Sequence, residues 1–266
     1  MELKPKKNTE IKKIGIITNP EKDTNLAFTR ELTGWIQDFA CEAVIGDNIF
    51  EDSDAIFVLG GDGTILRAAG RAAVRRKPLL GVNLGRLGYL TDVDRPDAKR
   101  ALTALLKGEY RIEKRMMLRI EDSDLLALND VCITRSSGKL IGIQLYINDE
   151  FIDEFRADGL IIATPTGSTA YTLSAGGPIL KPDVEMIAIT AICPHSLSLR
   201  PWVVSANDTV RVMASDARLM VDGENIGCLE QKQNIVVCRS EHITEIIKTT
   251  TLGFYEILRR KMLPRE

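Results

Sequence analysis

Short apolar runs alternate with amphipathic stretches over about the first hundred residues of the chain. Residues 14–18, 55–59 and 79–82 are almost continuously apolar, which is typical of parallel strands covered on both faces. Between such runs, apolar residues recur at helical spacing, as in the stretch that Thr24 or Asn25 would cap and that ends at Phe39. The alternation predicts a parallel sheet covered by helices. Further predicted elements of this part are a short strand at residues 43–45 and helices at residues 65–73 and from Pro96 to Gly108.

After Gly108 the pattern changes to short strands separated by turn residues. Residues 112–120, 125–135 and 141–155 are strand-like, and Asn148-Asp149 marks a turn within the last of them. This rhythm predicts a second, β-rich domain. Its remaining predicted strands are residues 160–163, 186–193, 203–205, 209–213, 219–221 and 235–238.

The predicted fold class is therefore an α/β N-terminal domain with a Rossmann-like parallel sheet, followed by a β-rich domain of the β-sandwich type. The apolar spacing of residues 252–263 predicts a tail helix that packs back on the first domain. The expected boundaries are residues 1–108 for the α/β domain, 109–248 for the β-rich domain and 249–266 for the tail.

Composition fits a two-domain protein with ordinary cores. The chain has 266 residues, of which 44% are hydrophobic, so each domain can bury a core of its own. The net charge of −2 argues against general binding to nucleic acid or to a membrane surface. Residues 1–13 and 259–266 each carry a charge of +3, which leaves −8 on the rest. We interpret the basic ends as solvated tails.

The apolar runs and the cysteines indicate a soluble protein, which we expect in the cytoplasm. No apolar run approaches the roughly 18 residues of a membrane span, and the lysine-rich start lacks a signal-peptide pattern. The cysteines never stand in Cys-x-x-Cys spacing, so neither a disulfide framework nor a zinc site is predicted. They are Cys41, Cys132, Cys193, Cys228 and Cys238.

A glycine-rich loop, Gly60-Gly61-Asp62-Gly63-Thr64, stands between a predicted buried strand and a predicted helix. Glycines expose backbone N–H groups and a helix N-terminus attracts anions, so the loop suits a phosphate. It has no Gly-Lys-Ser/Thr of a Walker A loop, and Leu66 replaces the third glycine of a Rossmann fingerprint. Asp62 would repel phosphate unless it accepts a proton from an attacking hydroxyl or holds a magnesium ion. The alternative is a structural turn in which Asp62 is the helix N-cap.

A second cluster of glycine, proline and hydroxyl residues follows the predicted strand Gly159–Ala163. It reads Thr-Pro-Thr-Gly-Ser-Thr-Ala-Tyr at residues 164–171 and Thr-Leu-Ser-Ala-Gly-Gly-Pro at residues 172–178. Such a segment can present amides, hydroxyls and one aromatic ring to a nucleotide. The same residue types also make ordinary turns.

Together the two segments resemble the NAD kinase family. That family carries a Gly-Gly-Asp-Gly loop in an α/β domain and this second sequence in a β-rich domain, and both stand here in the same order. Diacylglycerol and sphingosine kinases and phosphofructokinase share the glycine loop, whereas the second sequence is specific to NAD kinases. The resemblance spans roughly residues 12–260. Further matches are residues 81–90, Asn129-Asp130 and residues 192–201.

The resemblance implies transfer of a phosphoryl group to the 2′-hydroxyl of the adenosine ribose of NAD, which gives NADP. Asp62 matches the catalytic aspartate of the family, the general base for that hydroxyl, and a carboxylate within about 3 Å can accept its proton. Arg67, one turn into the predicted helix, can reach a phosphate, although an exposed helix arginine explains it equally well. The matches to the phosphate-binding loop are Gly60, Gly61, Gly63 and Thr64.

The resemblance also implies an NAD site in the β-rich domain. Asn129 and Asp130 match the Asn-Glu/Asp pair that holds the adenosine half, and Asp130 is one methylene shorter than the Glu of many family members. Arg156 and Asp158 match positions toward the nicotinamide half, and Lys139 matches another contact position. The remaining matches are Thr166, Thr169, Ala170, Tyr171, Thr172, Leu173 and Ser174 in the second cluster, and Glu224 in an Asp-Gly-Glu motif that closes the site.

Several of these matches also have a plainer interpretation. A solvated loop lysine explains Lys139, a core aromatic explains Tyr171, and a β-turn explains residues 222–224. We interpret His195 as a structural or site-shaping residue rather than a base, because the other histidine, His242, is distant and no serine-nucleophile motif is present.

The part of the chain between the two basic ends is acidic, yet it has to bind two polyanions, NAD and the phosphoryl donor, so positive groups are needed near them. The groups expected to bind the phosphates are backbone amides of the glycine loop, arginines and a divalent cation. We expect Mg²⁺, held mainly by donor phosphates and water, because the sequence contains no recognisable protein metal site. ATP and inorganic polyphosphate both stay open as donors, and NAD and NADH as acceptors. The resemblance implies a homodimer or homotetramer. The alternatives are a lipid kinase of the diacylglycerol or sphingosine type and an NAD or ADP-ribose sensor without turnover.

Overall fold

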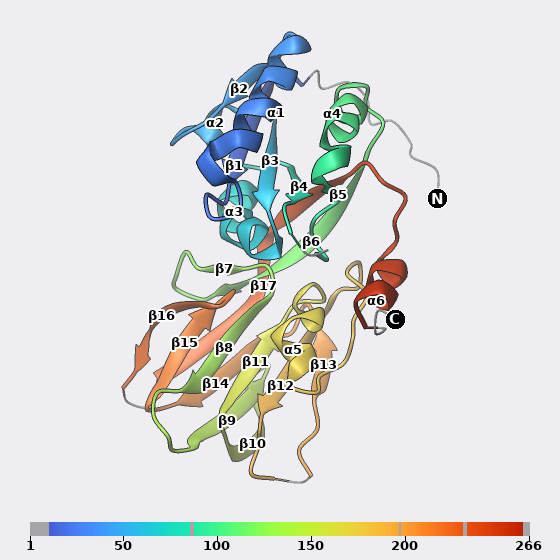
Figure 1. Cartoon of the computed structure of the whole chain (residues 1–266). Helices are drawn as coiled ribbons and strands as arrows, with labels where there is room; N and C mark the ends of the chain where they lie inside the picture. The colour runs from blue at the N-terminus through green and yellow to red at the C-terminus, as the bar shows by residue number, and fades with distance from the viewer. Residues whose placement is uncertain (1–10, 86–87, 197, 231–232, 263–266) are drawn as a thin grey trace. The chain divides into compact units, whose positions relative to one another are not determined.

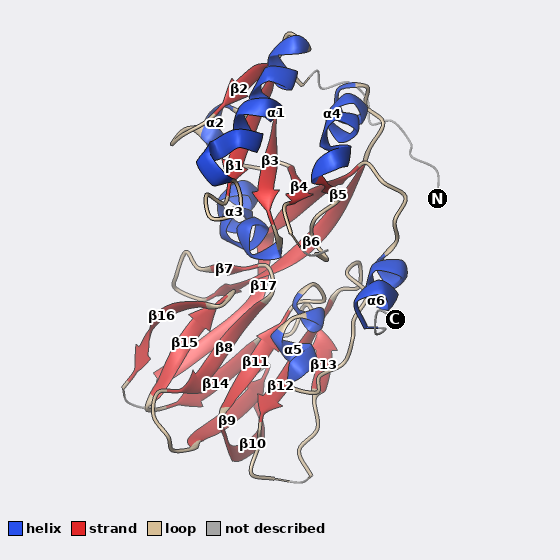
Figure 2. Cartoon of the chain, in the orientation of Figure 1, coloured by secondary structure: helices blue, strands red, loops and turns tan. Residues whose placement is uncertain are grey.

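The computed structural model describes residues 11–85, 88–196, 198–230 and 233–262. Contacts divide the chain into a first unit, Met1–Lys114 with Thr244–Glu266, and a second unit, Arg115–Ile243. Helices and strands alternate in the first unit (Figure 1), whereas strands dominate the second (Figure 2). The predicted fold class is confirmed: an α/β unit with a parallel sheet and a β-rich unit.

Parallel strands form the sheet of the first unit, in the order β2-β1-β3-β4. Every residue of β3 and β4 is buried, which explains why both strands are continuous apolar runs in the sequence. The strands are β1 (Lys13–Thr18), β2 (Glu42–Val44), β3 (Ala55–Gly60), β4 (Leu79–Asn83) and a short β5 (Val93–Asp94) beside β4. The helices before the tail are η1 (Thr24–Leu26), α1 (Ala27–Asp38), α2 (Ile49–Asp52), α3 (Asp62–Val74), η2 (Arg95–Asp97) and α4 (Ala98–Leu106).

The start of α1 differs from the prediction, because Asp23 rather than Thr24 or Asn25 satisfies the first helical N–H groups. The Asp23 carboxylate accepts hydrogen bonds from the backbone N–H groups of Phe28 (2.8 Å) and Thr29 (2.9 Å). It also accepts one from the Thr29 hydroxyl at 2.6 Å. The η1 turn separates this aspartate from the helix, so the cap is not adjacent to the helix in the sequence.

Antiparallel hydrogen-bonded strands form two layers in the second unit, in the orders β10-β9-β14-β17 and β13-β12-β11-β8-β15-β16. One core takes side chains from both layers, such as Ile143 of β9 and Ile162 of β11, as in a β-sandwich. The strands, of which β6 and β17 have residues in both units, are β6 (Arg111–Ile120), β7 (Leu126–Ala127), β8 (Asp130–Arg135), β9 (Ile141–Ile147), β10 (Glu150–Ala157), β11 (Gly159–Ala163), β12 (Met186–Ile192), β13 (Trp202–Ser205), β14 (Val210–Ala214), β15 (Ala217–Val221), β16 (Glu224–Leu229) and β17 (Gln233–Lys248).

Four segments depart from the pattern predicted after Gly108. The predicted strand 125–135 is divided into β7 and β8. The strand β16 has no apolar alternation to reveal it, because most of its residues are exposed. The strand β17 extends far beyond the predicted residues 235–238. The sequence pattern does not reveal the rest of it, because polar side chains such as Ser240 and Thr244 are buried there. Two short helices, η3 (Gly167–Thr169) and α5 (Tyr171–Ser174), stand where a loop was expected.

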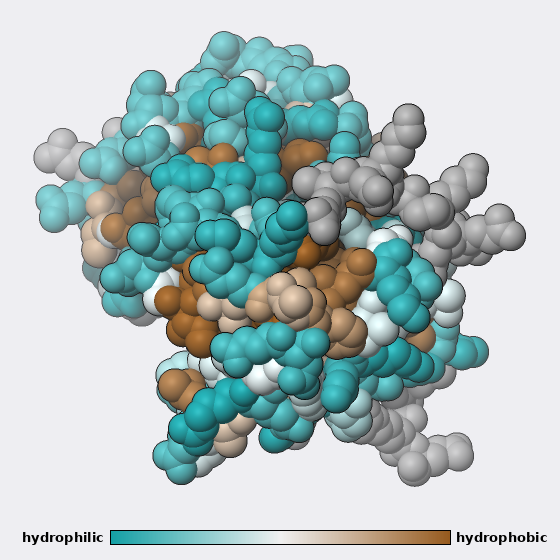
Figure 3. All heavy atoms as spheres, turned by 90° about the horizontal axis from the view of Figure 1, so that it is seen from above, coloured by the Kyte–Doolittle hydropathy of each residue, from teal (hydrophilic) through white to brown (hydrophobic). Residues whose placement is uncertain are grey.

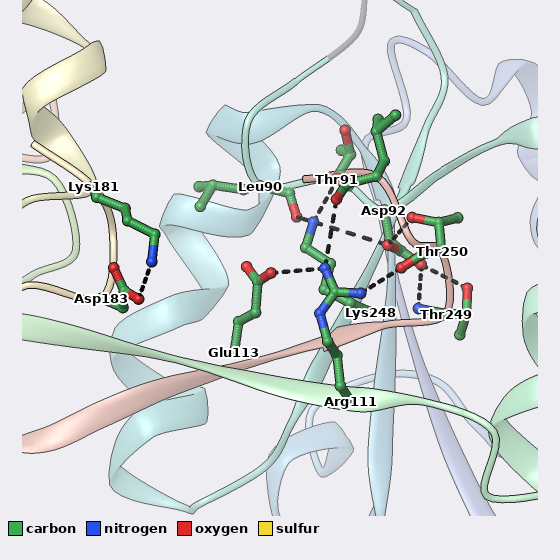
Figure 4. A network of polar contacts seen from close by, with 11 residues as sticks. Leu90, Thr91, Asp92, Arg111, Glu113, Lys181, Asp183, Lys248, Thr249 and Thr250 are labelled. Atoms are coloured by element: carbon green, nitrogen blue, oxygen red, sulfur yellow. Dashed lines mark hydrogen bonds and ion pairs between the residues drawn. The ribbon is translucent and has the colours of Figure 1, made fainter. Parts of the chain in front are cut away.

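A buried polar network holds the chain after β17 against the β4–β5 connection (Figure 4). The Asp92 carboxylate accepts hydrogen bonds from the backbone N–H of Thr249 (2.7 Å), from its hydroxyl (2.6 Å) and from the hydroxyl of Thr250 (3.0 Å). The Lys248 ammonium donates to the backbone oxygen of Thr91 at 2.9 Å and lies 4.0 Å from Asp92 Oδ1. These contacts fix the point from which the tail begins.

The tail helix α6 (Phe254–Met262) belongs to the first unit, as expected. Its residue Ile257 is buried, while the basic side chains gather in its last turn. Leu263, the predicted end of the helix, and most of the two basic ends lie outside the described residues.

Hydrophilic residues cover most of the face shown in Figure 3, around a hydrophobic area near the middle of the view. Within the described residues, no helix is long and apolar enough to cross a membrane. This face is thus of the mixed polar kind found on globular proteins.

Candidate functional site

The glycine loop connects β3 to α3 in the first unit. Gly61 occupies the N-cap position, and its backbone N–H donates to the Thr64 hydroxyl at 3.5 Å. Asp62 is the first residue of α3, so the interpretation of Asp62 as the N-cap is wrong. The loop therefore places a carboxylate at the beginning of a helix without using it as the cap.

The Asp62 carboxylate is held by the segment that follows β4. Its Oδ2 accepts a hydrogen bond from the backbone N–H of Tyr89 at 2.8 Å, and its Oδ1 accepts one from that of Leu90 at 2.9 Å. Gly88 makes this approach possible, because a Cβ at that position would lie 2.1 Å from Asp62 Oδ1. Two backbone donors from one short segment thus fix the orientation of a partly exposed carboxylate.

Two lysine ammonium groups lie close to the loop, while the predicted Arg67 is exposed. The Lys261 ammonium lies 3.7 Å from Asp62 Oδ2. The Lys22 ammonium would lie only 3.2 Å from a Cβ placed on Gly61 and 3.7 Å from one placed on Gly85. Both lysines are cations beside a loop with the geometry of an anion site.

Asp222 organises the predicted Asn129-Asp130 pair in the second unit. One carboxylate oxygen of Asp222 accepts hydrogen bonds from the backbone N–H groups of Asn129 (2.7 Å) and Asp130 (3.1 Å). The other accepts one from Leu128 at 2.8 Å. This clamp explains the break between β7 and β8, since the backbone there binds a side chain instead of a neighbouring strand.

Asp130 is buried and only 5% exposed. Burial and the nearby charge of Asp222 raise the pKa of Asp130 to about 6, against the effect of a hydrogen bond from the Cys132 thiol. The thiol lies 3.2 Å from Asp130 Oδ1, and burial raises its pKa strongly. Asp130 therefore titrates much closer to neutral pH than an ordinary aspartate does.

The second cluster packs directly against Asn129. The Thr164 backbone N–H donates to the Asn129 carbonyl oxygen at 2.8 Å, and the Thr164 hydroxyl donates to the Leu128 carbonyl oxygen at 2.6 Å. A Cβ on Gly167 would lie 2.1 Å from the Asn129 carbonyl oxygen, so only glycine fits there. The Ser168 hydroxyl ties the turn to the Pro165 carbonyl oxygen at 2.6 Å. The structure thus brings the two predicted motifs of the second unit together.

Tyr171 lies at the edge of this arrangement and is 45% exposed, so it is not a core aromatic. Burial of its phenol raises the pKa of Tyr171, and the charges of Asp158 and Asp130 add to the rise. Asp158 forms an ion pair with Arg135 at 3.2 Å.

Other predicted site residues of the second unit differ widely in exposure. Thr172 is fully buried, and Thr166, also buried, accepts a hydrogen bond from Arg115 at 3.5 Å. Thr169, Ala170 and Leu173 are half-buried. The exposed residues are Lys139, Arg156, Ser174, Glu224 and His195.

Sequence reasoning missed three contributors: the clamp by Asp222, and the two lysines Lys22 and Lys261. The sequence places Asp222 in the Asp-Gly-Glu motif but does not predict the clamp, because its partners lie more than ninety positions away. Lys22 follows an Asn-Pro turn after β1, which is the one local signal for it. Residues 86, 87 and 197 of the motifs quoted above lie outside the described residues.

Comparison with known proteins settles the family. Residues 47–110 match the ATP-NAD kinase N-terminal domain, and residues 128–249 match the ATP-NAD kinase C-terminal domain. The NAD kinase of Caldanaerobacter subterraneus subsp. tengcongensis is 39% identical over 283 residues, which cover 96% of this chain and 100% of that protein. The chain belongs to the NAD kinase family. Another member, the NAD kinase of Acetivibrio thermocellus, is 38% identical and covers 95% of this chain.

Two solved structures from the same family share the fold. An NAD kinase from Archaeoglobus fulgidus in complex with ATP has a TM-score of 0.81 at 26% identity, covering 92% of this chain and 98% of that one. Yeast NADH kinase complexed with NADH also has a TM-score of 0.81, at 27% identity, covering 97% of this chain and 90% of that one.

Proposed function

We propose that the chain transfers the terminal phosphoryl group of ATP to the 2′-hydroxyl of the adenosine ribose of NAD, forming NADP. The observation that carries the proposal is the Asp62 carboxylate, which two backbone N–H groups fix beside the glycine loop. Membership of the NAD kinase family supports it, as does the ATP bound by the Archaeoglobus fulgidus relative.

In this proposal Asp62 is the general base. The ribose hydroxyl oxygen forms a bond to the terminal phosphorus of ATP while the bond from that phosphorus to ADP breaks. The electron pair of the broken bond stays on ADP. The hydroxyl proton passes to Asp62 as the new bond forms. Gly60, Gly61, Gly63 and Thr64 would bind donor phosphate through backbone N–H groups and a hydroxyl. The exposed Arg67 would bind the same phosphates through its guanidinium group.

We assign the adenosine half of NAD to the second unit. Asn129 offers an amide, and Asp130 a carboxylate that accepts hydrogen bonds from hydroxyl or amino groups. The exposed ring of Tyr171 can stack on a base. We assign Arg156 and Asp158 to the nicotinamide half of NAD. The other proposed contacts with NAD are Lys139, Thr166, Thr169, Ala170, Thr172, Leu173, Ser174 and Glu224.

A divalent cation, Mg²⁺, is part of the proposal because the donor carries several negative charges. The described ranges contain no group of three or more His, Cys, Asp or Glu side chains that could hold a metal ion. Oxygen atoms of the donor phosphates and water suit Mg²⁺ and would supply most of its ligands. When bound, the cation neutralises charge on the phosphates.

A matrix of donors and acceptors tests the function. The purified chain is incubated with Mg²⁺, with ATP or polyphosphate as donor, and with NAD, NADH or diacylglycerol as acceptor. We expect NADP from ATP and NAD, detected with an NADP-specific dehydrogenase. Phosphate incorporation into diacylglycerol instead would identify a lipid kinase. Binding of NAD without NADP from any donor would identify a sensor.

We also propose a cytoplasmic homodimer or homotetramer, on the basis of the family resemblance. Light scattering of the full chain after size-exclusion chromatography measures the assembly. A monomeric mass over the whole working concentration range would contradict this part of the proposal.

A further inference from the structure

The tail helix brings a charged side chain to Asp62. Arg259, Arg260 and Lys261 stand in the last turn of α6. Arg260 pairs with Glu256 of the same helix, and its side chain is 53% exposed. The side chain of Lys261 is only 27% exposed, and its ammonium lies 3.7 Å from Asp62 Oδ2. The two neighbouring basic residues therefore have different environments.

An aromatic ring holds the same ammonium from another side. Lys261 Nζ lies 3.8 Å from the centre of the Tyr89 ring, within the range of a cation–π contact. Tyr89 also donates its backbone N–H to Asp62. Burial lowers the pKa of the Lys261 ammonium, while Asp62 acts in the opposite direction. A cation that has lost part of its hydration gains more from a new anionic ligand than a fully hydrated one.

One short segment connects the glycine loop to the tail. Tyr89 and Leu90 donate hydrogen bonds to Asp62, and the next residues, Thr91 and Asp92, bind residues 248–250 just before the tail helix. Residues 89–92 thus hold both ends of the tail. They bind residues 248–250 before helix α6, and they bind Asp62, which in turn contacts Lys261 in the last turn of that helix. Such anchoring at both ends distinguishes Lys261 from a surface lysine on a frayed helix.

We propose that Lys261 is a catalytic residue whose ammonium binds the phosphoryl group being transferred, next to the Asp62 base. The inference rests on the proposed function. A polyphosphate that approaches a carboxylate is repelled, and a cation between them removes that repulsion. The ammonium has three N–H donors, so it can contact Asp62 and a phosphoryl oxygen together. Lys261 stays protonated throughout, while the hydroxyl proton goes to Asp62.

Three variants of the full chain test this inference in the NADP assay. Lys261→Met keeps the length of the side chain and removes its charge, Lys261→Arg keeps the charge, and Arg260→Met is the matched control in the same turn. For Lys261→Met we expect kcat to fall about 100-fold, the cost of losing one preorganised donor, with the KM for NAD changed by less than about threefold. Lys261→Arg should recover part of kcat, and Arg260→Met should stay within about twofold of the parent chain.

Several results would overturn the inference. The first is a kcat of Lys261→Met within about threefold of that of the parent chain. The second is an increased kcat, which would mean that the contact inhibits the enzyme. The third is a loss of activity that accompanies a lowered unfolding temperature and that Lys261→Arg does not recover. If Lys261→Met does not fold, Lys261→Gln is measured in its place against the same thresholds. A parent chain that makes no NADP from any donor would instead refute the proposed function.

Discussion

The backbone N–H of Asn129 donates a 2.7 Å hydrogen bond to the carboxylate of Asp222, 93 positions further along the chain. The same carboxylate binds the N–H groups of Leu128 and Asp130. A side chain directly after β15 therefore fixes the backbone of the pair to which we assign the adenosine of NAD.

Replacing Asp222 by Asn should weaken both the fold and the binding of NAD. One acceptor oxygen becomes an NH₂ group that faces backbone donors, and an unsatisfied buried group costs about 1–3 kcal/mol. We expect an unfolding free energy lower by about that amount and an NAD dissociation constant raised at least about tenfold. Calorimetric titration and urea unfolding measure the two effects. Asp216→Asn, an exposed position that also has a positive φ, is the control.

Binding of NAD should depend on pH through Asp130. Its pKa is raised to about 6, so the carboxylate becomes protonated as the pH falls through that value. An acceptor for the ribose is then lost, and we expect the affinity for NAD to fall below about pH 6 and to be constant above about pH 7. Calorimetry across this range checks the prediction. If affinity stays constant down to about pH 5, Asp130 either titrates like an ordinary aspartate or does not bind NAD.

A methyl group at position 167 should disturb the same backbone. The Cβ of Gly167→Ala would lie 2.1 Å from the Asn129 carbonyl oxygen, so one of the two segments has to move. We expect a loss of about 1–3 kcal/mol in unfolding free energy, typical of overpacking, together with a higher KM for NAD. Gly142→Ala, where a Cβ meets nothing within 4 Å, should leave both quantities near those of the parent chain.

Lys22 should affect the binding of the phosphoryl donor rather than the binding of the acceptor. Its ammonium lies over Gly61 and Gly85, where the glycine loop is expected to bind phosphate. We predict that Lys22→Met raises the KM for ATP about tenfold, with the KM for NAD nearly constant, because the loss of one charged contact costs about 1.4 kcal/mol or more. The exposed Lys107 provides the control, Lys107→Met. Equal changes in the two KM values would argue against a donor-specific role.

The sequence predicts the fold well where burial is complete or strictly alternating. The buried strands β3 and β4 and the β9–β10 hairpin stand where their patterns indicate. It fails where burial and polarity diverge, as in β17, which buries Ser240 and Thr244, and in β16, which is mostly exposed. Apolar periodicity carries no information on such strands.

Local motifs reveal the candidate site only in part. Asp62 and the Asn129-Asp130 pair stand in recognisable sequences, since the backbone geometry of a glycine loop or a clamped strand end needs particular residue types. The contacts of Asp222 and Lys261 join positions far apart in the chain, and a single sequence contains no pattern that pairs them. Lys261 in particular looks like one of several basic residues in a solvated tail.

The most direct test of the central claim is the turnover number of Asp62→Asn with ATP, Mg²⁺ and NAD, measured beside Asp38→Asn, an exposed aspartate at the end of α1. If Asp62 is the general base, kcat falls by about 10²–10⁴-fold while calorimetry still detects NAD binding within about threefold of the parent chain, and Asp38→Asn is unaffected. An Asp62→Asn chain that forms NADP at nearly the parent rate would contradict the account.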